Sequence, residues 1–146
     1  MVKNLFSVIF ISILIVSCDN QKSIVGTDND IEVYYLNLTS YLEKDGNGFY
    51  HMNLLDGYNQ TFTTLTAETG SNVNIQKVYW AANKQIYVNG YWVDLVNNSS
   101  YTDESGQAHT VFSGWSEFIQ DTITVFAGYD DEFENNYLDS LKIIVE

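Results

Sequence analysis

The side chains that most often bind transition metals or act as nucleophiles and bases are rare in this sequence, which has only two histidines and one cysteine. The histidines, His51 and His109, stand far apart and outside any metal-ligand spacing such as HxxxH. Zinc and other transition metals usually need several His or Cys ligands. We therefore expect both histidines to be ordinary exposed or half-buried residues of strands.

The densest set of carboxylates lies near the C-terminal end, in residues 130–139. Calcium takes about six to eight oxygen ligands, and this stretch is rich in hard oxygens. Its spacing matches no EF-hand, so two interpretations stay open: a solvated acidic hairpin loop and a calcium site. No other cofactor is expected. The candidate calcium ligands are Asp130, Asp131, Glu132, Glu134 and Asp139.

The sharpest local signal is Asn89-Gly90, the preferred pair for a two-residue type I′ hairpin turn. Setting Val88 opposite Tyr91 places Tyr87 and Trp92 on one face of this hairpin. A continuous apolar set then occupies the other face. Its members are Ile86, Val88, Tyr91, Val93 and Leu95.

Tyr87 and Trp92 are the candidate ligand-binding residues, because their face lies opposite the continuous apolar set. Exposed aromatic rings there would form a platform for sugar rings. A second sheet could equally cover the same face, in which case both rings belong to the core. The sequence leaves both interpretations open.

No catalytic motif indicates an enzyme. The chain has no Gly-X-Ser-X-Gly sequence around a nucleophile and no glycine-rich loop that opens a helix. Paired carboxylates can hydrolyse glycosides, but with 19 acidic residues some pairs will be close by chance. We predict a non-enzymatic protein, with a paired-carboxylate glycoside hydrolase as an alternative.

The N-terminal residues have the layout of a signal peptide. Lys3 supplies a positive charge, and residues 5–16 are apolar except for two serines. This run is too short to span a bilayer as a helix, which needs about 20 apolar residues. The following Ile15-Val16-Ser17-Cys18 resembles the lipobox of bacterial lipoproteins.

The lipobox resemblance implies where the protein resides. It implies cleavage after Ser17 and acylation of Cys18, so that acyl chains hold the mature protein on a membrane. The location expected from it is the bacterial cell envelope, with the domain facing the periplasm or the exterior. Residues 1–17 are then the signal peptide, residues 18–30 a polar flexible tether and residues 31–146 one folded domain.

Charge and cysteine content narrow the possible partners and the source of stability. The formal charge is −13, and all six basic residues are lysines. Such a chain repels phosphate backbones, so nucleic acid is a poor partner. Because Cys18 is the only cysteine, an acylated mature chain has no disulfide, and a hydrophobic core must stabilise it.

The folded region predicts an all-β structure. About 8–9 short alternating strands, separated by turn residues, favour an antiparallel β-sandwich. Strand patterns at residues 122–129 and 140–145 indicate a long closing hairpin, and Trp115, Phe118 and Ile119 indicate one helical turn before it. With Trp80 on an earlier strand, residues 58–146 resemble a bacterial immunoglobulin-like or fibronectin type III-like domain.

These features together predict a lipid-anchored cell-envelope protein with a binding or structural role. Its expected partners are the membrane, through the acyl chains, and a protein or glycan of the cell surface. A glycan-binding module that uses Trp92 and Tyr87 is the second interpretation, and the hydrolase is the third.

Overall fold

The computed structural model describes residues 23–25, 32–70, 75–129 and 137–146. Cys18 and the predicted signal peptide lie outside these residues, as do four of the five candidate calcium ligands, Asp130, Asp131, Glu132 and Glu134. No helix among the described residues is long and apolar enough to cross a membrane.

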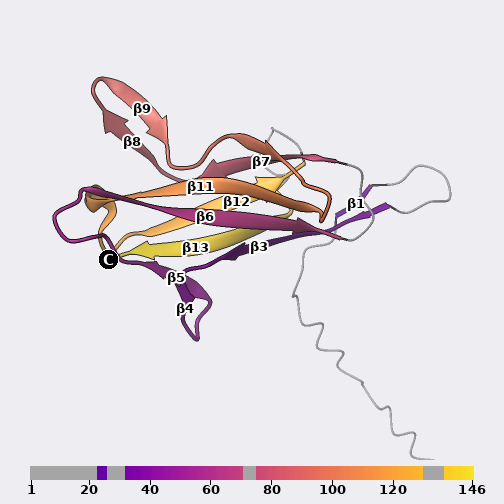
Figure 1. The fold of residues 1–146 in the computed structure, drawn as a ribbon, viewed down its shortest axis with the longest axis horizontal. Coiled ribbons are helices and arrows are strands. Elements are labelled where there is room, and N and C mark those ends of the chain that lie inside the picture. The colour runs from indigo at the N-terminus through magenta and orange to yellow at the C-terminus, as the bar shows by residue number, and fades with distance from the viewer. Residues whose placement is uncertain (1–22, 26–31, 71–74, 130–136) are drawn as a thin grey trace, which may run out of the picture.

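Two sheets of unequal size, formed mainly by antiparallel strand pairs, pack face to face around one core (Figure 1). This arrangement confirms the predicted all-β sandwich. One sheet has six strands in the order β10-β7-β12-β13-β5-β4, and the other has three in the order β11-β6-β3. The six-stranded sheet consists of β4 (Glu43–Lys44), β5 (Phe49–Met52), β7 (Lys77–Ala82), β10 (Ser99–Tyr101), β12 (Thr122–Gly128) and β13 (Asp139–Val145). The three-stranded sheet consists of β3 (Leu36–Ser40), β6 (Gln60–Thr69) and β11 (Gln107–Trp115).

Four further strands form two small ribbons outside the sandwich sheets. β1 (Ser23–Val25) pairs with β2 (Glu32–Tyr34), so part of the predicted tether is joined to the start of the domain. β8 (Gln85–Val88) pairs with β9 (Tyr91–Asp94). The described residues thus contain more strands than the predicted eight or nine, because several strands are only two or three residues long.

Alternating side chains of the closing hairpin form the centre of the core, as the sequence predicts. Ile123, Val125 and Ala127 of β12 are fully buried, and Ile143 and Val145 of β13 lie beside them. From the opposite sheet, β6 and β11 contribute their inward-facing residues to the same core. These residues are Leu65, Ala67, Ala108 and Phe112.

Trp80 on β7 is one of the largest side chains in this core and is almost completely buried. Its indole Nε1 donates a hydrogen bond of 2.9 Å to the Ser100 hydroxyl on the neighbouring strand β10. This bond satisfies the single polar atom of the ring, so its whole apolar surface is buried without an unpaired donor.

Two local predictions have different outcomes. The helical turn expected before the closing hairpin is present as η1 (Ser116–Phe118), a 3₁₀ turn. The sequence pattern also predicts a strand with Val73, Ile75, Val78 and Trp80 on one face. The strand begins at Lys77, Val78 and Trp80 are buried in it and Ile75 is exposed outside it, whereas Val73 lies outside the described residues. Just before that strand, Gln76 donates its N–H to the hydroxyl of Thr102.

One pairing has no counterpart in the sequence-based prediction. β5 runs parallel to β13, with Phe49 opposite Lys142 and Met52 opposite Val145. Most of the domain separates the two strands in sequence, and β5 lies between β13 and the edge strand β4.

Asp139, a candidate calcium ligand, connects the two sheets. Its Oδ2 accepts a 2.7 Å hydrogen bond from the backbone N–H of Leu38 on β3, and its Oδ1 accepts one from Ser140 N–H. Because β3 is an edge strand, the carboxylate satisfies a donor that would otherwise be free to pair with another chain.

Replacement of this carboxylate should therefore destabilise the sandwich. We expect Asp139→Ala to lower the free energy of unfolding by about 1–3 kcal/mol, because a partly buried backbone donor loses its acceptor. Urea denaturation measures this, and Asp139→Asn, which keeps an acceptor oxygen, should lose less. Equal losses in both variants would contradict this role of the side-chain oxygen.

Candidate functional site

The β8–β9 hairpin projects from the sandwich at the end opposite β1 (Figure 1). Val88 lies opposite Tyr91, as the sequence predicts. Asn89 and Gly90 have φ values of 50° and 91°, and two successive positive values are the signature of the type I′ turn. Turn chemistry and side-chain pattern therefore give the same register. We call residues 85–94 the hairpin arm.

The two candidate binding residues lie directly opposite each other on this arm. Tyr87 is 59% exposed and Trp92 is 68% exposed, so no second sheet covers their face. Their ring centroids are 5.2 Å apart, and the ring planes are tilted by 59°. Such tilted contact between aromatic rings is favourable, so the pair stabilises the arm while both rings stay accessible.

The opposite face of the arm is only partly buried. Ile86 and Leu95 belong to the core, whereas Tyr91 is 73% exposed and Val93 is 42% exposed. Val88 is partly buried against the core, and the arm leaves the sandwich beyond it. Its outer part therefore exposes apolar side chains on both faces.

Charged groups of the arm and its base are all engaged where the arm joins the sandwich. Lys84, just before β8, donates to Asp121 at 2.5 Å, and its ammonium lies over the Phe118 ring. Asp94 accepts a 2.5 Å hydrogen bond from the side-chain amide of Gln85. Residues 86–93 carry no ionisable acid or base other than tyrosine, so the tip is an uncharged, aromatic surface.

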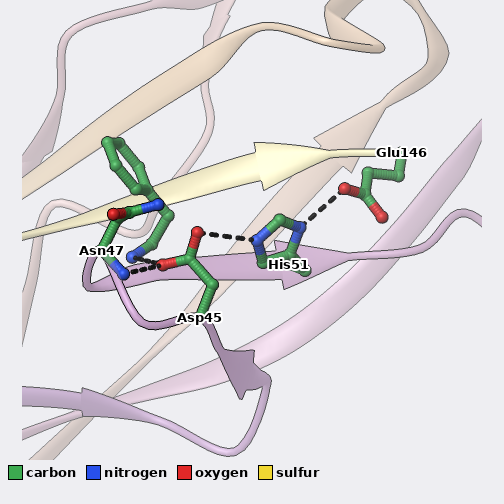
Figure 2. Close-up of polar contacts among 5 residues, drawn as sticks. Asp45, Asn47, His51 and Glu146 are labelled. Carbon is green, nitrogen blue, oxygen red and sulfur yellow. Dashed lines mark hydrogen bonds and ion pairs between the residues drawn. The ribbon is translucent and has the colours of Figure 1, made fainter.

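A second cluster joins the β4–β5 turn to the end of β13, and Figure 2 shows His51 between two carboxylates. His51 Nδ1 lies 2.6 Å from Glu146 Oε1, and its Nε2 lies 3.5 Å from Asp45 Oδ2. The other oxygen of Asp45 accepts hydrogen bonds from the N–H groups of Asn47 and Phe49.

Proton affinities in this cluster follow from its contacts. The hydrogen bond with Glu146 raises the pKa of His51, and Asp45 adds to that effect, while partial desolvation opposes it. The backbone N–H of Phe49, followed by that of Asn47, lowers the pKa of Asp45. The cluster is thus an ionic clasp that is strongest when His51 is charged.

The sequence did not identify this cluster, because His51 and Glu146 are 95 positions apart. The turn containing Asp45 could be predicted from composition, but the parallel pairing that brings β5 beside β13 could not. His109 lies on β11, where its Nδ1 is 3.0 Å from the hydroxyl of Thr66 on β6. Both histidines are therefore strand residues, as expected.

A calcium site in the acidic loop stays a prediction. Of its candidate ligands only Asp139 is described, and its carboxylate already accepts two backbone hydrogen bonds. Within the described part of the chain, no three His, Cys, Asp or Glu side chains are grouped so that they could hold a metal ion.

Comparison with known proteins adds no relative. No family model, no curated protein and no solved structure matches this chain.

The clasp predicts a specific pH dependence of stability. Because the pKa of His51 is raised above its ordinary value of 6.5, its contribution is complete below pH 6.5 and is lost as the pH rises through the folded-state value. Between pH 6 and 9 we expect the melting temperature of His51→Gln to fall less than that of the unmodified protein. Thermal unfolding followed by circular dichroism measures this difference.

The second histidine provides the control. His109→Gln removes a histidine that lies against Thr66 and not between carboxylates, so the pH dependence of the unmodified protein should persist in it. If His51→Gln and the unmodified protein lost stability equally over this pH range, the clasp would contribute nothing.

Proposed function

We propose that this chain is a lipid-anchored protein of the bacterial cell envelope with a non-enzymatic binding role, in which the hairpin arm contacts the partner. The observation that carries the binding role is the projecting arm, on which Tyr87 and Trp92 stay more than half exposed. Large exposed aromatic groups are costly in water and typically mark binding surfaces.

The N-terminal sequence supports the anchor. A basic residue, a short apolar run and Ile15-Val16-Ser17-Cys18 follow one another in the order that lipoprotein processing requires. Acylation of Cys18 gives a membrane-held domain without any spanning helix. The strong negative charge of the chain suits a protein that must stay soluble at a crowded surface.

We also infer an immunoglobulin-like or fibronectin type III-like ancestry for the sandwich. Trp80, buried on a strand of the larger sheet, and the long closing hairpin β12–β13 support this inference. Domains of this class commonly bind through loops and hairpins at one end of the sandwich, which is where the arm lies (Figure 1).

Glycan binding is the second candidate function, and the tilted Tyr87–Trp92 pair favours it. Aromatic rings offer flat apolar surfaces to the C–H faces of sugars, while the tyrosine hydroxyl and the indole N–H remain available for sugar hydroxyls. Both groups lie on one face of the arm, so one ligand would contact both.

The anchor is tested by replacing its acceptor atom. In bacteria that produce the full chain, we expect Cys18→Ser to abolish acyl modification, because serine lacks the thiol that lipoprotein processing modifies. Mass spectrometry of the membrane fraction should find acylated Cys18 as the first residue of the unmodified protein. A chain that keeps residues 1–17 and carries no acyl group would refute the proposed location.

The binding role is tested by crosslinking in the same cells. Benzoylphenylalanine in place of Trp92 should give a covalent adduct of higher mass on illumination, because the proposed partner lies against that position. The same photoreactive residue in place of Tyr101, which is 65% exposed on β10 and outside the arm, is the matched control. Adducts from both positions, or from neither, would refute contact through the arm.

A further inference from the structure

The hairpin arm is a ridge rather than a pocket, and this shape limits the ligands that suit it. A small-molecule site encloses about 70–90% of its ligand in a concavity. The rings of Tyr87, Tyr91 and Trp92 instead stand exposed on a two-stranded ribbon that projects beyond both sheets (Figure 1). A small molecule on this ridge would stay mostly in water, whereas an extended polymer can lie along it.

The available contact area also argues against a protein partner held by the arm alone. A fully buried aromatic side chain contributes roughly 150–250 Å². With the exposed fractions of Tyr87, Tyr91 and Trp92, the three rings offer at most about 500 Å². A stable protein–protein interface takes about 800 Å² from each partner. A weak site of this size becomes effective on a repetitive polymer, because many anchored copies bind one ligand together.

Charge distinguishes between kinds of polymer. The chain as a whole has a formal charge of −13, which repels polyanions. The tip of the arm is uncharged: Lys84 and Asp94 at its base are engaged by Asp121 and Gln85, and no charge lies between them. An anionic polymer is repelled by the acidic chain, whereas an uncharged polysaccharide meets no such repulsion, and its hydroxyls match the neutral tip.

The position of the arm argues against a lipid surface as its occupant. β1 directly follows the region that would lead from the anchor, and the arm lies at the other end of the sandwich (Figure 1). On an anchored protein the arm would therefore point away from the membrane that holds it.

We propose that the hairpin arm binds uncharged polysaccharide chains through Trp92 and Tyr87, which share one face of the arm. This inference rests on the proposed binding role of the arm and adds the chemical class of its ligand. The sugar rings pack against the aromatic faces, and the Asn89 side-chain amide at the turn can both donate to and accept from hydroxyls.

Affinity electrophoresis of the full chain in non-ionic detergent tests this inference. Native gels contain dextran, galactomannan or arabinoxylan as uncharged probes, and alginate or polygalacturonate as anionic probes. We expect at least one uncharged polysaccharide to retard the protein and the anionic ones to leave its migration unchanged. Trp92→Ala and Tyr87→Ala should each weaken the retardation about tenfold, as loss of a central aromatic contact does.

Two further variants separate the loss of a contact from a loss of folding. Tyr101→Ala removes an equally exposed tyrosine away from the arm and should leave the retardation unchanged. Trp92→Phe keeps an aromatic face and should retain most of it. Each variant is also melted, so that a tenfold weaker retardation with an unchanged melting temperature reports on binding.

The outcomes separate this inference from the binding role on which it rests. Retardation by the anionic polysaccharides alone would overturn the uncharged ligand, although a binding role would stand. No retardation by any uncharged probe, or equal retardation of Trp92→Ala, would overturn polysaccharide binding by the arm. The crosslinked adduct formed by benzoylphenylalanine at position 92 gives a further test. If protease digestion removed the mass that the partner adds to this adduct, the partner would be a protein. The inference would then fail, while the proposed function held.

Discussion

The packing of Trp80 and Phe112 between two sheets of unequal width is the constraint on which the rest of the molecule depends. Both side chains are almost completely buried, and each of the large apolar groups around them contributes about 1.5–3 kcal/mol through its removal from water. With one cysteine in the chain, no intramolecular disulfide can replace this contribution. The turns, the arm and the histidine clasp are all attached to strands that this core holds in place.

The parts of the fold that the sequence predicted are those that depend on neighbouring residues. Alternation along β12 and β13 identifies their buried face directly, and the two strands are consecutive along the chain. The parallel pairing of β5 with β13 has no such signal, because a parallel neighbour needs no turn and leaves the alternation of either strand unchanged. The same holds for the contact between Asp139 and the backbone of Leu38, which spans 101 positions.

The candidate site shows the same division. The register of the arm could be predicted because Asn89-Gly90 determines it within a few residues. Its projection from the sandwich could not, because that depends on where Ile86 and Leu95 find space in the core. Tyr91 and Val93 belong to the apolar set of the hairpin, and their exposure is the departure from local rules that is expected of a functional surface.

An isolated two-stranded hairpin is marginal in water, so the arm must be stabilised by features outside its backbone ladder. Ile86 and Leu95 anchor its base in the core, and the ion pair between Lys84 and Asp121 fixes the point where it leaves the sheet. At the other end, the Tyr87–Trp92 contact joins the two strands across their exposed face. Because these rings are already held, a ligand that packs against them orders few additional side chains, and the entropic cost of binding is reduced.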